Sequence, residues 1–362
     1  MGVTIRTLMV SQAFGSVGVS SGFVVSTLLA ANLAPSASLA GLAQTASTVG
    51  SAAAAGVLAL LATEKGRRAA LRAGYLVGAF GAVTCLLGAA FGSFWTFVLG
   101  MVSYGAAAAA NLQARYAAAD GAPAGRRGRA LSLIVWITTI GAVLGPNTIG
   151  LAATVGLPDL SGSFVFALVG FLVAAAIVHL LPVAHVASEN VSYESFQGSR
   201  LPLLSLCAGH AAMIAVMSMT SLHMKHGGAD LVSVGVVFSV HMAGMYAFSP
   251  VFGFVADRWG PWRSSVLGHV VLLASFAFSA ASFLVVGLLL LGLGWSCVLV
   301  SSSAAMERRA QGLSDVLMNV CAAIAGLGAG VVLDLLGFVA LNAVCAALVI
   351  LVLGCYFFCR TR

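Results

Sequence analysis

Two histidines stand inside long apolar runs of the sequence, where an ionisable side chain is unusual. His210 lies nine residues into the run 201–225, and His241 lies eleven residues into the run 230–256. At 1.5 Å per residue these depths are about 14 Å and about 17 Å. Imidazole, with an ordinary pKa near 6.5, exchanges protons at physiological pH. We therefore expect His210 and His241 to carry a proton or contact a substrate; the alternative is a satisfied structural role for each.

Methionines share a helical face with the first of these histidines. They follow His210 at steps of three, four and seven residues: Met213, Met217 and Met224. Three interpretations stay open. The face is ordinary packing, an adaptable wall for apolar ligands, or a path for a soft metal such as Cu(I).

Further polar or aromatic side chains inside apolar runs are candidates to line a substrate cavity. Buried amides need hydrogen-bond partners, which are either neighbouring helices or a bound solute. The candidates, together with the two methionines nearest His210, are Gln44, Asn111, Gln113, Trp136, Asn147, Met213, Met217, Trp295 and Asn319.

The composition indicates what kind of protein positions these residues. Only 7% of the 362 residues are charged and 60% are hydrophobic, whereas soluble domains average about 25% charged residues. The surface therefore meets lipid. The 42 glycines suit close packing of membrane helices. The net charge of +7 comes from basic residues in short gaps between apolar runs, which argues against nucleic-acid binding.

Several kinds of chemistry find no support in the motifs. The seven cysteines fall inside apolar runs without the spacing of a disulfide framework or zinc site. No HExxH and no GxxxxGK[ST] pattern occurs, so we expect no enzyme activity, no bound metal or other cofactor, and no direct use of ATP.

Twelve apolar runs are long enough to span a membrane as helices, which takes about 20 residues each. We therefore predict an all-α polytopic membrane protein with twelve transmembrane helices in two pseudo-symmetric six-helix bundles. The bundles comprise residues 1–186 and 201–362, and a polar cytoplasmic linker, 187–200, joins them. The predicted helices span residues 5–32, 37–62, 69–90, 93–118, 128–153, 160–186, 201–225, 230–256, 264–281, 283–306, 312–336 and 338–359.

The basic residues predict the orientation of this bundle. Cytoplasmic loops of membrane proteins collect lysine and arginine. With twelve helices, all of the 17 basic residues except Lys225 fall on one side. Among them, we expect Arg115 to anchor the fourth predicted helix at the membrane interface. We predict that this side and both termini are cytoplasmic, in a multi-pass protein of the cell inner or plasma membrane.

The run 230–256 ends in a motif, Gly253-Phe-Val-Ala-Asp257-Arg258-Trp-Gly260-Pro-Trp-Arg263. Asp257 is suited to accept hydrogen bonds from the N-terminus of a neighbouring helix. Arg258 and Arg263 are expected to pair across the loop, and Gly260 permits a tight turn. An ordinary basic loop is the alternative.

A degenerate copy of this motif follows the second predicted helix. There the sequence is Thr63-Glu64-Lys65-Gly66-Arg67-Arg68, with Thr63 in place of the aspartate and Glu64 beside it. We expect a weaker contact at this copy.

The fifth predicted helix carries Gly141, Gly145, Pro146 and Gly150. Gly141 and Gly145 lie on one face and permit close helix packing. Pro146 removes one backbone hydrogen bond and is expected to bend the helix. A simple packing kink is the alternative to a functional motif.

These two motifs resemble signatures of the major facilitator superfamily, and the resemblance extends over the whole chain. The G-x-x-x-D-R-x-G-x-x-R pattern is similar to the loop that latches the two halves of such transporters in one access state. The G-x-x-x-G-P pattern is similar to a motif of the proton-coupled drug antiporters with twelve helices. Two features depart from that branch: Met101 stands where its members carry a buried arginine, and the first helix lacks an acid.

The resemblance implies a secondary transporter that works by alternating access and binds a small-molecule substrate within the lipid bilayer. We expect proton-coupled export of small apolar or amphipathic compounds by a monomer. The alternatives are transport of another solute, such as a metal ion or nutrient, or a receptor or silent relative that transports nothing.

Overall fold

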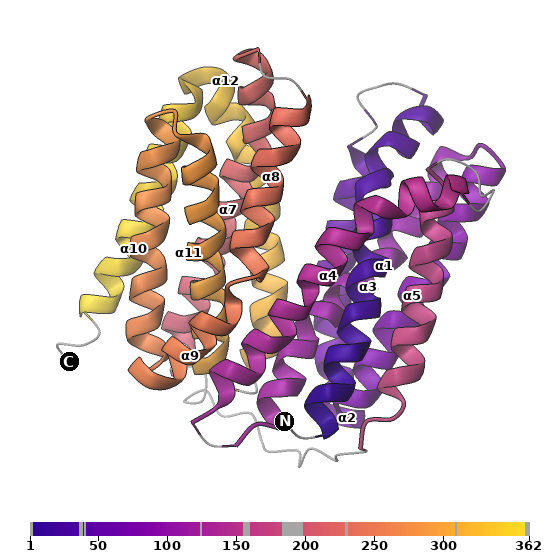
Figure 1. The fold of residues 1–362 in the computed structure, drawn as a ribbon, viewed down its shortest axis with the longest axis horizontal. Helices are drawn as coiled ribbons and strands as arrows, with labels where there is room; N and C mark the ends of the chain where they lie inside the picture. Colours follow the sequence, from indigo (N-terminus) through magenta and orange to yellow (C-terminus); the bar gives the residue numbers. More distant parts are fainter. Residues whose placement is uncertain are drawn as a thin grey trace. The chain divides into compact units, whose positions relative to one another are not determined.

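The computed structural model describes residues 3–35, 39, 41–123, 125–154, 160–182, 198–228, 231–307 and 310–358. Within these ranges the chain is almost entirely helical (Figure 1). The helices are α1 (Val3–Leu33), α2 (Leu42–Ala90), α3 (Phe94–Asp120), α4 (Arg127–Thr154), α5 (Gly162–Val178), α7 (Arg200–His226), α8 (Leu231–Tyr246), α9 (Ser249–Trp259), α10 (Pro261–Ala280), α11 (Leu284–Ala305) and α12 (Ala310–Phe358).

Nine helices in the described ranges are long and apolar enough to cross a membrane. Two of them, α2 and α12, have 49 residues each, or about 74 Å at 1.5 Å per residue, over twice the ~30 Å hydrocarbon core. Each contains one non-helical glycine near its centre and is therefore a pair of spanning helices. With the 17-residue α5 and with α8 and α9 forming one span, these segments account for the twelve predicted helices.

Glycine makes the sharp reversals at three of these junctions. Gly66 in α2, Gly260 between α9 and α10, and Gly337 in α12 have φ values of 84°, 86° and 82°. Side chains disfavour this left-handed region, whereas glycine adopts it without steric cost. The turn predicted at Gly260 is therefore confirmed, and Gly66 adopts nearly the same conformation in the degenerate copy.

The chain divides into two compact units. Unit 1 comprises residues 1–121 and 137–190, and unit 2 comprises residues 122–136 and 191–362. The boundary inside α4 falls between Trp136 and Ile137, so that the first turns of this helix belong to unit 2. The predicted division at residues 186 and 201 stays a prediction, and residues 187–197 of the predicted linker lie outside the described ranges.

Small residues bring the helices of unit 1 into direct backbone contact. A Cβ atom on Gly50 of α2 would overlap the Val102 carbonyl of α3, and one on Gly105 of α3 would overlap the Ser47 carbonyl of α2. In α1, Gly22 leaves room for the Tyr104 hydroxyl, which accepts from the Gly22 N–H at 3.1 Å. These contacts explain why glycine recurs along the spanning helices.

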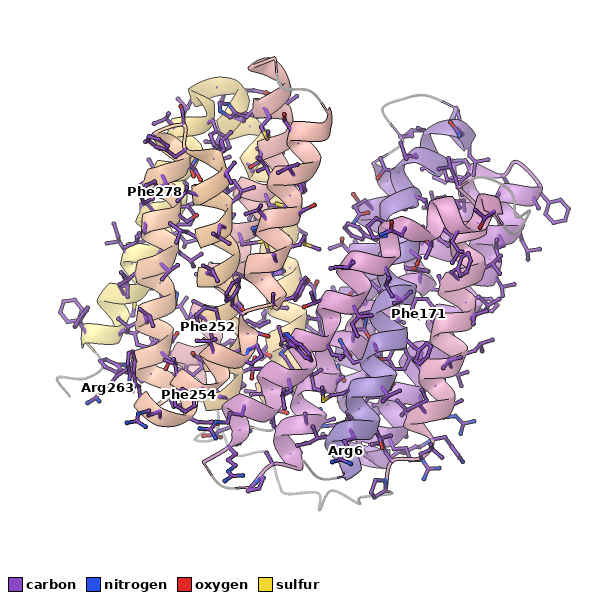
Figure 2. All side chains as sticks on the ribbon, in the orientation of Figure 1. Arg6, Phe171, Phe252, Phe254, Arg263 and Phe278 are labelled. Carbon is purple, nitrogen blue, oxygen red and sulfur yellow. The ribbon has the colours of Figure 1, made fainter. Side chains whose placement is uncertain are left out.

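Polar contacts gather several helix ends at one end of unit 1. Arg67, after the glycine turn of α2, pairs with Asp120 at the end of α3 at 3.0 Å. Arg68 contacts His179, just after α5. Arg6, near the start of α1, lies at the same end (Figure 2). This clustering matches the predicted alternation of basic loops.

In unit 2 a buried network of hydroxyl groups and one histidine ties four helices together. Ser205 of α7 contacts Ser265 of α10 at 2.8 Å, and Ser302 of α11 donates to Ser205 at 3.1 Å. Tyr356 of α12 donates to Ser265 at 2.9 Å. His269 lies 3.4 Å from the Ser205 hydroxyl and donates from Nδ1 to the Ser265 carbonyl at 2.7 Å. No motif in the sequence marks this network.

Two expectations from the sequence are wrong in detail. The sixth spanning helix ends at Val178, eight residues before the predicted residue 186. Residues 179–182, at the polar end of unit 1, are not helical. Arg115, which was expected to face the membrane interface, is buried. Its guanidinium donates to the Tyr116 hydroxyl at 3.1 Å and to the Leu112 carbonyl, so these two partners lie inside unit 1.

The close approach of α2 and α3 predicts that Gly50→Ala destabilises the protein. The new methyl group meets the rigid Val102 backbone, and overpacking of this kind costs about 1–3 kcal/mol. Thermal unfolding of the detergent-purified protein measures the effect. Gly330→Ala is the matched control, because a Cβ at this helical glycine of α12 meets no atom within 4 Å. Equal unfolding temperatures for the two variants would contradict the packing described.

Candidate functional site

The candidate site in unit 2 is built around a hydrogen bond between two ring side chains. Trp295 of α11 donates from Nε1 to Nδ1 of His210 of α7 at 2.8 Å. His210 is the eleventh of 27 residues in α7 and Trp295 the twelfth of 22 in α11, so both lie near the middle of a spanning helix. Both residues are candidates predicted from the sequence, but their contact with each other was not predicted.

A third ring extends this pair. Tyr246, at the end of α8, packs edge-on against Trp295 with ring centroids 6.1 Å apart. Trp295 is buried, whereas His210 and Tyr246 are only partly buried. We call His210, Trp295 and Tyr246 the ring cluster. It draws on three helices that are far apart in the sequence.

The methionines predicted to share the His210 face differ in their exposure. Met213 is buried, and Met217 is partly buried. Both lie on α7 after His210, one and two helical turns further along. Together with the ring cluster they give this stretch of α7 an apolar, polarisable character.

His241 has a different environment from His210. Its side chain is 0% exposed, and Nδ1 donates to the Leu288 carbonyl of α11 at 2.9 Å. Nε2 is also buried and has no hydrogen-bond partner among the described residues. His241 is therefore enclosed in the α8–α11 contact, and its predicted role in proton coupling stays a prediction.

The remaining cavity candidates occupy separate places. In unit 1, Gln44 accepts from Ser26 at 3.2 Å, Asn111 accepts from Tyr75 at 2.8 Å, and Gln113 donates to the Ala55 carbonyl at 2.8 Å. Asn147 and Asn319 donate to carbonyls of their own helices, at Val143 and Asp315, and Trp136 is exposed. The structure does not bring these residues into one cluster within either unit.

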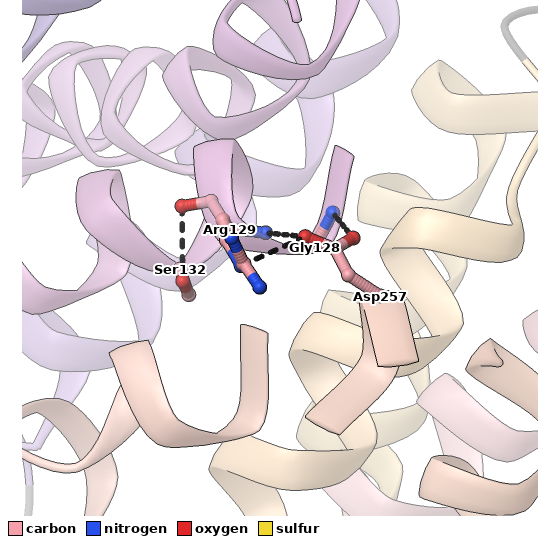
Figure 3. Close-up of polar contacts among 4 residues, drawn as sticks. All are labelled: Gly128, Arg129, Ser132 and Asp257. Atoms are coloured by element: carbon pink, nitrogen blue, oxygen red, sulfur yellow. Dashed lines mark hydrogen bonds and ion pairs between the residues drawn. The ribbon is translucent and has the colours of Figure 1, made fainter. Parts of the chain in front are cut away.

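The carboxylate of Asp257 caps the N-terminus of α4, and both partners lie in unit 2 (Figure 3). Oδ1 accepts from the Gly128 N–H at 2.8 Å, and Oδ2 accepts from the Arg129 N–H at 3.1 Å. The Arg129 side chain adds an ion pair at 3.6 Å. The predicted contact with a helix N-terminus is therefore present, and its role as a gate stays a prediction.

The glycine that opens this motif allows the contact. A Cβ on Gly253 would overlap the Ser132 hydroxyl and lie 2.7 Å from the Gly128 carbonyl, so α9 can approach α4 only with glycine here. Ser249, one turn earlier, donates to the Ser132 carbonyl at 3.0 Å. The first turns of α4 are thus held along their length as well as at the end.

The arginines of the motif are arranged differently from the prediction. Arg258 and Arg263 are exposed, and Figure 2 shows Arg263 pointing away from the helices. Within the part of the chain that the structure describes, neither makes a hydrogen bond or ion pair. The expected pairing across the loop is therefore not seen there.

Over the described residues of unit 1, the degenerate copy shows no carboxylate cap like that of Asp257. Thr63 donates its hydroxyl to the Leu60 carbonyl of its own helix at 2.7 Å, and Glu64 is exposed. Arg67 pairs instead with Asp120 at the end of α3.

The glycines of the fifth predicted helix face α1 within unit 1. A Cβ on Gly141 would overlap Ser16, and one on Gly145 would overlap Ser20. The predicted shared face and close packing are therefore confirmed. Gly150 meets nothing within 4 Å, and α4 continues past Pro146 to Thr154.

Tyr246 is the member of the ring cluster that the sequence analysis missed. Its position four residues before Pro250, where a spanning helix is interrupted, was the available signal. In the described ranges no three His, Cys, Asp or Glu residues lie together as a metal site would need.

Comparisons with known proteins match this chain over most of its length. A family model described as Major Facilitator Superfamily matches residues 8–311. The chain is 30% identical to the uncharacterised MFS-type transporter YdeG of Bacillus subtilis, covering 99% of this chain and 92% of that protein. It is 29% identical to the riboflavin transporter RfnT of Brucella anthropi, covering 80% and 78%. A crystal structure of a bacterial homologue of the iron transporter ferroportin has the same fold, with a TM-score of 0.79 and 13% identity over 100% of both chains.

The cap on α4 predicts that Asp257→Ala lowers the free energy of unfolding by about 0.5–2 kcal/mol, the usual effect of losing a helix N-cap. Asp257→Asn keeps one acceptor oxygen and should lose less. Glu64→Gln, at an exposed carboxylate, is the control in thermal unfolding of the purified protein. If Asp257→Ala and Glu64→Gln unfold at the same temperature, the cap adds nothing to stability.

Proposed function

The chain belongs to the major facilitator superfamily of membrane transporters, and from that premise we propose that it is a proton-coupled secondary transporter in which His210 takes up the proton. The hydrogen bond from Trp295 to His210 carries this proposal. The protein works by alternating access to the two sides of the membrane.

The chemistry of the two rings makes the bond sensitive to protonation. An indole N–H only donates, so Nδ1 of His210 must be the acceptor, and the neutral imidazole carries its proton on Nε2. A second proton would occupy Nδ1 and place two donors face to face. Protonation therefore breaks the bond and frees the Trp295 indole, so that proton uptake and the position of Trp295 are linked.

The rest of the ring cluster suits an apolar or amphipathic substrate. Trp295 and Tyr246 present aromatic surface, and Met213 and Met217 follow on α7. Aromatic rings and thioethers adapt to varied apolar ligands. We propose export of such compounds in exchange for protons, as in the drug antiporter branch, by a monomer of the inner or plasma membrane with both termini cytoplasmic.

Uptake of a nutrient with a flat aromatic ring is a second candidate. The 29% identity to a riboflavin transporter over 80% of the chain favours it, and so does the ring cluster, since riboflavin stacks on aromatic side chains. Fluorescence of riboflavin entering or leaving proteoliposomes distinguishes this candidate from drug export.

The proposal predicts that His210→Gln abolishes proton-linked transport. In proteoliposomes an imposed gradient of one pH unit should drive about tenfold accumulation of a substrate exchanged for one proton. The substrate is found by screening amphipathic dyes and riboflavin against the wild-type protein. His210→Gln should bind it yet show no response to the pH gradient, because glutamine does not titrate.

His241→Gln is the matched control, since it removes a buried histidine from the neighbouring helix. It should keep the response to the pH gradient. Trp295→Phe, which removes the indole N–H donor but keeps an aromatic ring, should shift the pH at which transport is half-maximal. A wild-type response in His210→Gln, or its loss only in His241→Gln, would assign proton uptake to another group.

A further inference from the structure

Three cationic or ionisable side chains converge at the polar end of unit 1, outside the ring cluster. The Arg68 guanidinium lies 2.8 Å and 3.1 Å from the two ring nitrogens of His179 and donates to the Leu181 carbonyl at 3.2 Å. Arg72, one turn further along α2, lies 3.4 Å from Nδ1 of the same ring. We call Arg68, Arg72 and His179 the basic cluster.

The charges of the basic cluster are not balanced within the protein. A neutral imidazole offers one acceptor nitrogen, yet two guanidinium groups turn toward it. In the described ranges Arg68 and Arg72 have no carboxylate partner, since Asp120 pairs with Arg67. Thr63, which replaces the aspartate of the motif, is bonded to its own helix. Two adjacent cations therefore retain N–H donors for an external anion.

An apolar surface begins where the basic cluster ends. Along α2 the exposed residues Leu76, Phe80, Val83 and Leu87 follow Arg72 at steps of three or four and so share its face. On α5, which packs against α2, Val169 and Leu172 are exposed and three residues apart, and Leu180 is exposed just after the helix ends. Phe80 is 65% exposed and Leu180 is 73% exposed. A charged end thus continues directly into two apolar stripes on neighbouring helices.

We propose that this surface binds an anionic phospholipid. The phosphate of the headgroup accepts hydrogen bonds from Arg68 and Arg72, with His179 beside it, and the acyl chains lie along the apolar stripes of α2 and α5. Guanidinium groups bind phosphate oxygens with two parallel hydrogen bonds, and basic residues at a membrane surface attract anionic lipids. The apolar stripes favour a lipid over free phosphate, because free phosphate has no apolar part that could contact them.

The test measures lipid binding to the purified, detergent-solubilised protein by native mass spectrometry and thermal unfolding. The added probes are phosphatidylglycerol, phosphatidylcholine and inorganic phosphate. The test variant is Arg68→Gln/Arg72→Gln. Its control is Lys65→Gln/Arg263→Gln, which removes two exposed basic residues with no partner among the described residues. Transport activity is not needed for the readout.

We expect phosphatidylglycerol to bind and to raise the unfolding temperature of the wild type and of the control. Binding should weaken about thirtyfold in Arg68→Gln/Arg72→Gln, from the loss of two surface charges near the headgroup. Phosphatidylcholine and inorganic phosphate should give no comparable stabilisation.

Three results would overturn the proposal: equal effects of phosphatidylglycerol and phosphatidylcholine, a full effect of inorganic phosphate alone, or unchanged binding in the double variant. If the double variant does not fold, Arg72→Gln alone decides the question, because Arg72 is exposed and, among the residues that the structure describes, contacts only His179, at 3.4 Å. Unchanged binding of phosphatidylglycerol to that variant would then reject the site.

Discussion

Hydrocarbon offers no hydrogen-bond partner, and this absence governs every polar group inside the spanning helices. The backbone satisfies itself as helix, since each unpaired group would cost several kcal/mol in lipid. Side chains follow the same rule. Thr84 and Ser239 donate back to carbonyls four residues earlier, at Phe80 and Gly235. A side chain that bonds across helices, as Trp295 does to His210, is therefore selecting one helix arrangement over others.

The two units meet this constraint in different ways. In unit 1, α2 and α3 touch backbone to backbone at Gly50 and Gly105, and polar side chains such as Tyr75 and Asn111 bridge the two helices elsewhere. In unit 2, several helix contacts run through polar side chains: the Asp257 carboxylate on α4, the ring cluster, and the serines around His269. Three histidines whose rings hydrogen-bond to another spanning helix, His210, His241 and His269, lie in unit 2, in keeping with a proton site there.

The sequence predicts the helices and their turns well because both follow from strong local rules. A run of about twenty apolar residues spans the membrane as a helix. Glycine permits a sharp turn between two such runs, as Gly260 does with its positive φ. Asp257 was predictable as well, since a carboxylate beside a glycine turn suits a helix N-terminus. The different environments of His210 and His241 could not be predicted from the sequence. An apolar helix has no amphipathic period to show which of its faces meets a neighbouring helix. Arg115 was misplaced for a related reason: its partner Tyr116 is adjacent in sequence but gives no sign of burial.

The hydroxyl network around Ser205, Ser265 and Ser302 has a mechanical consequence. A hydroxyl both donates and accepts, and its hydrogen rotates freely between partners. In the Ser205–Ser265 and Ser265–Ser302 contacts either oxygen can supply the proton. When one helix slides slightly past another, the network can re-pair without leaving an orphaned group. The network therefore holds α7, α10, α11 and α12 together, yet resists small sliding movements between these helices only weakly.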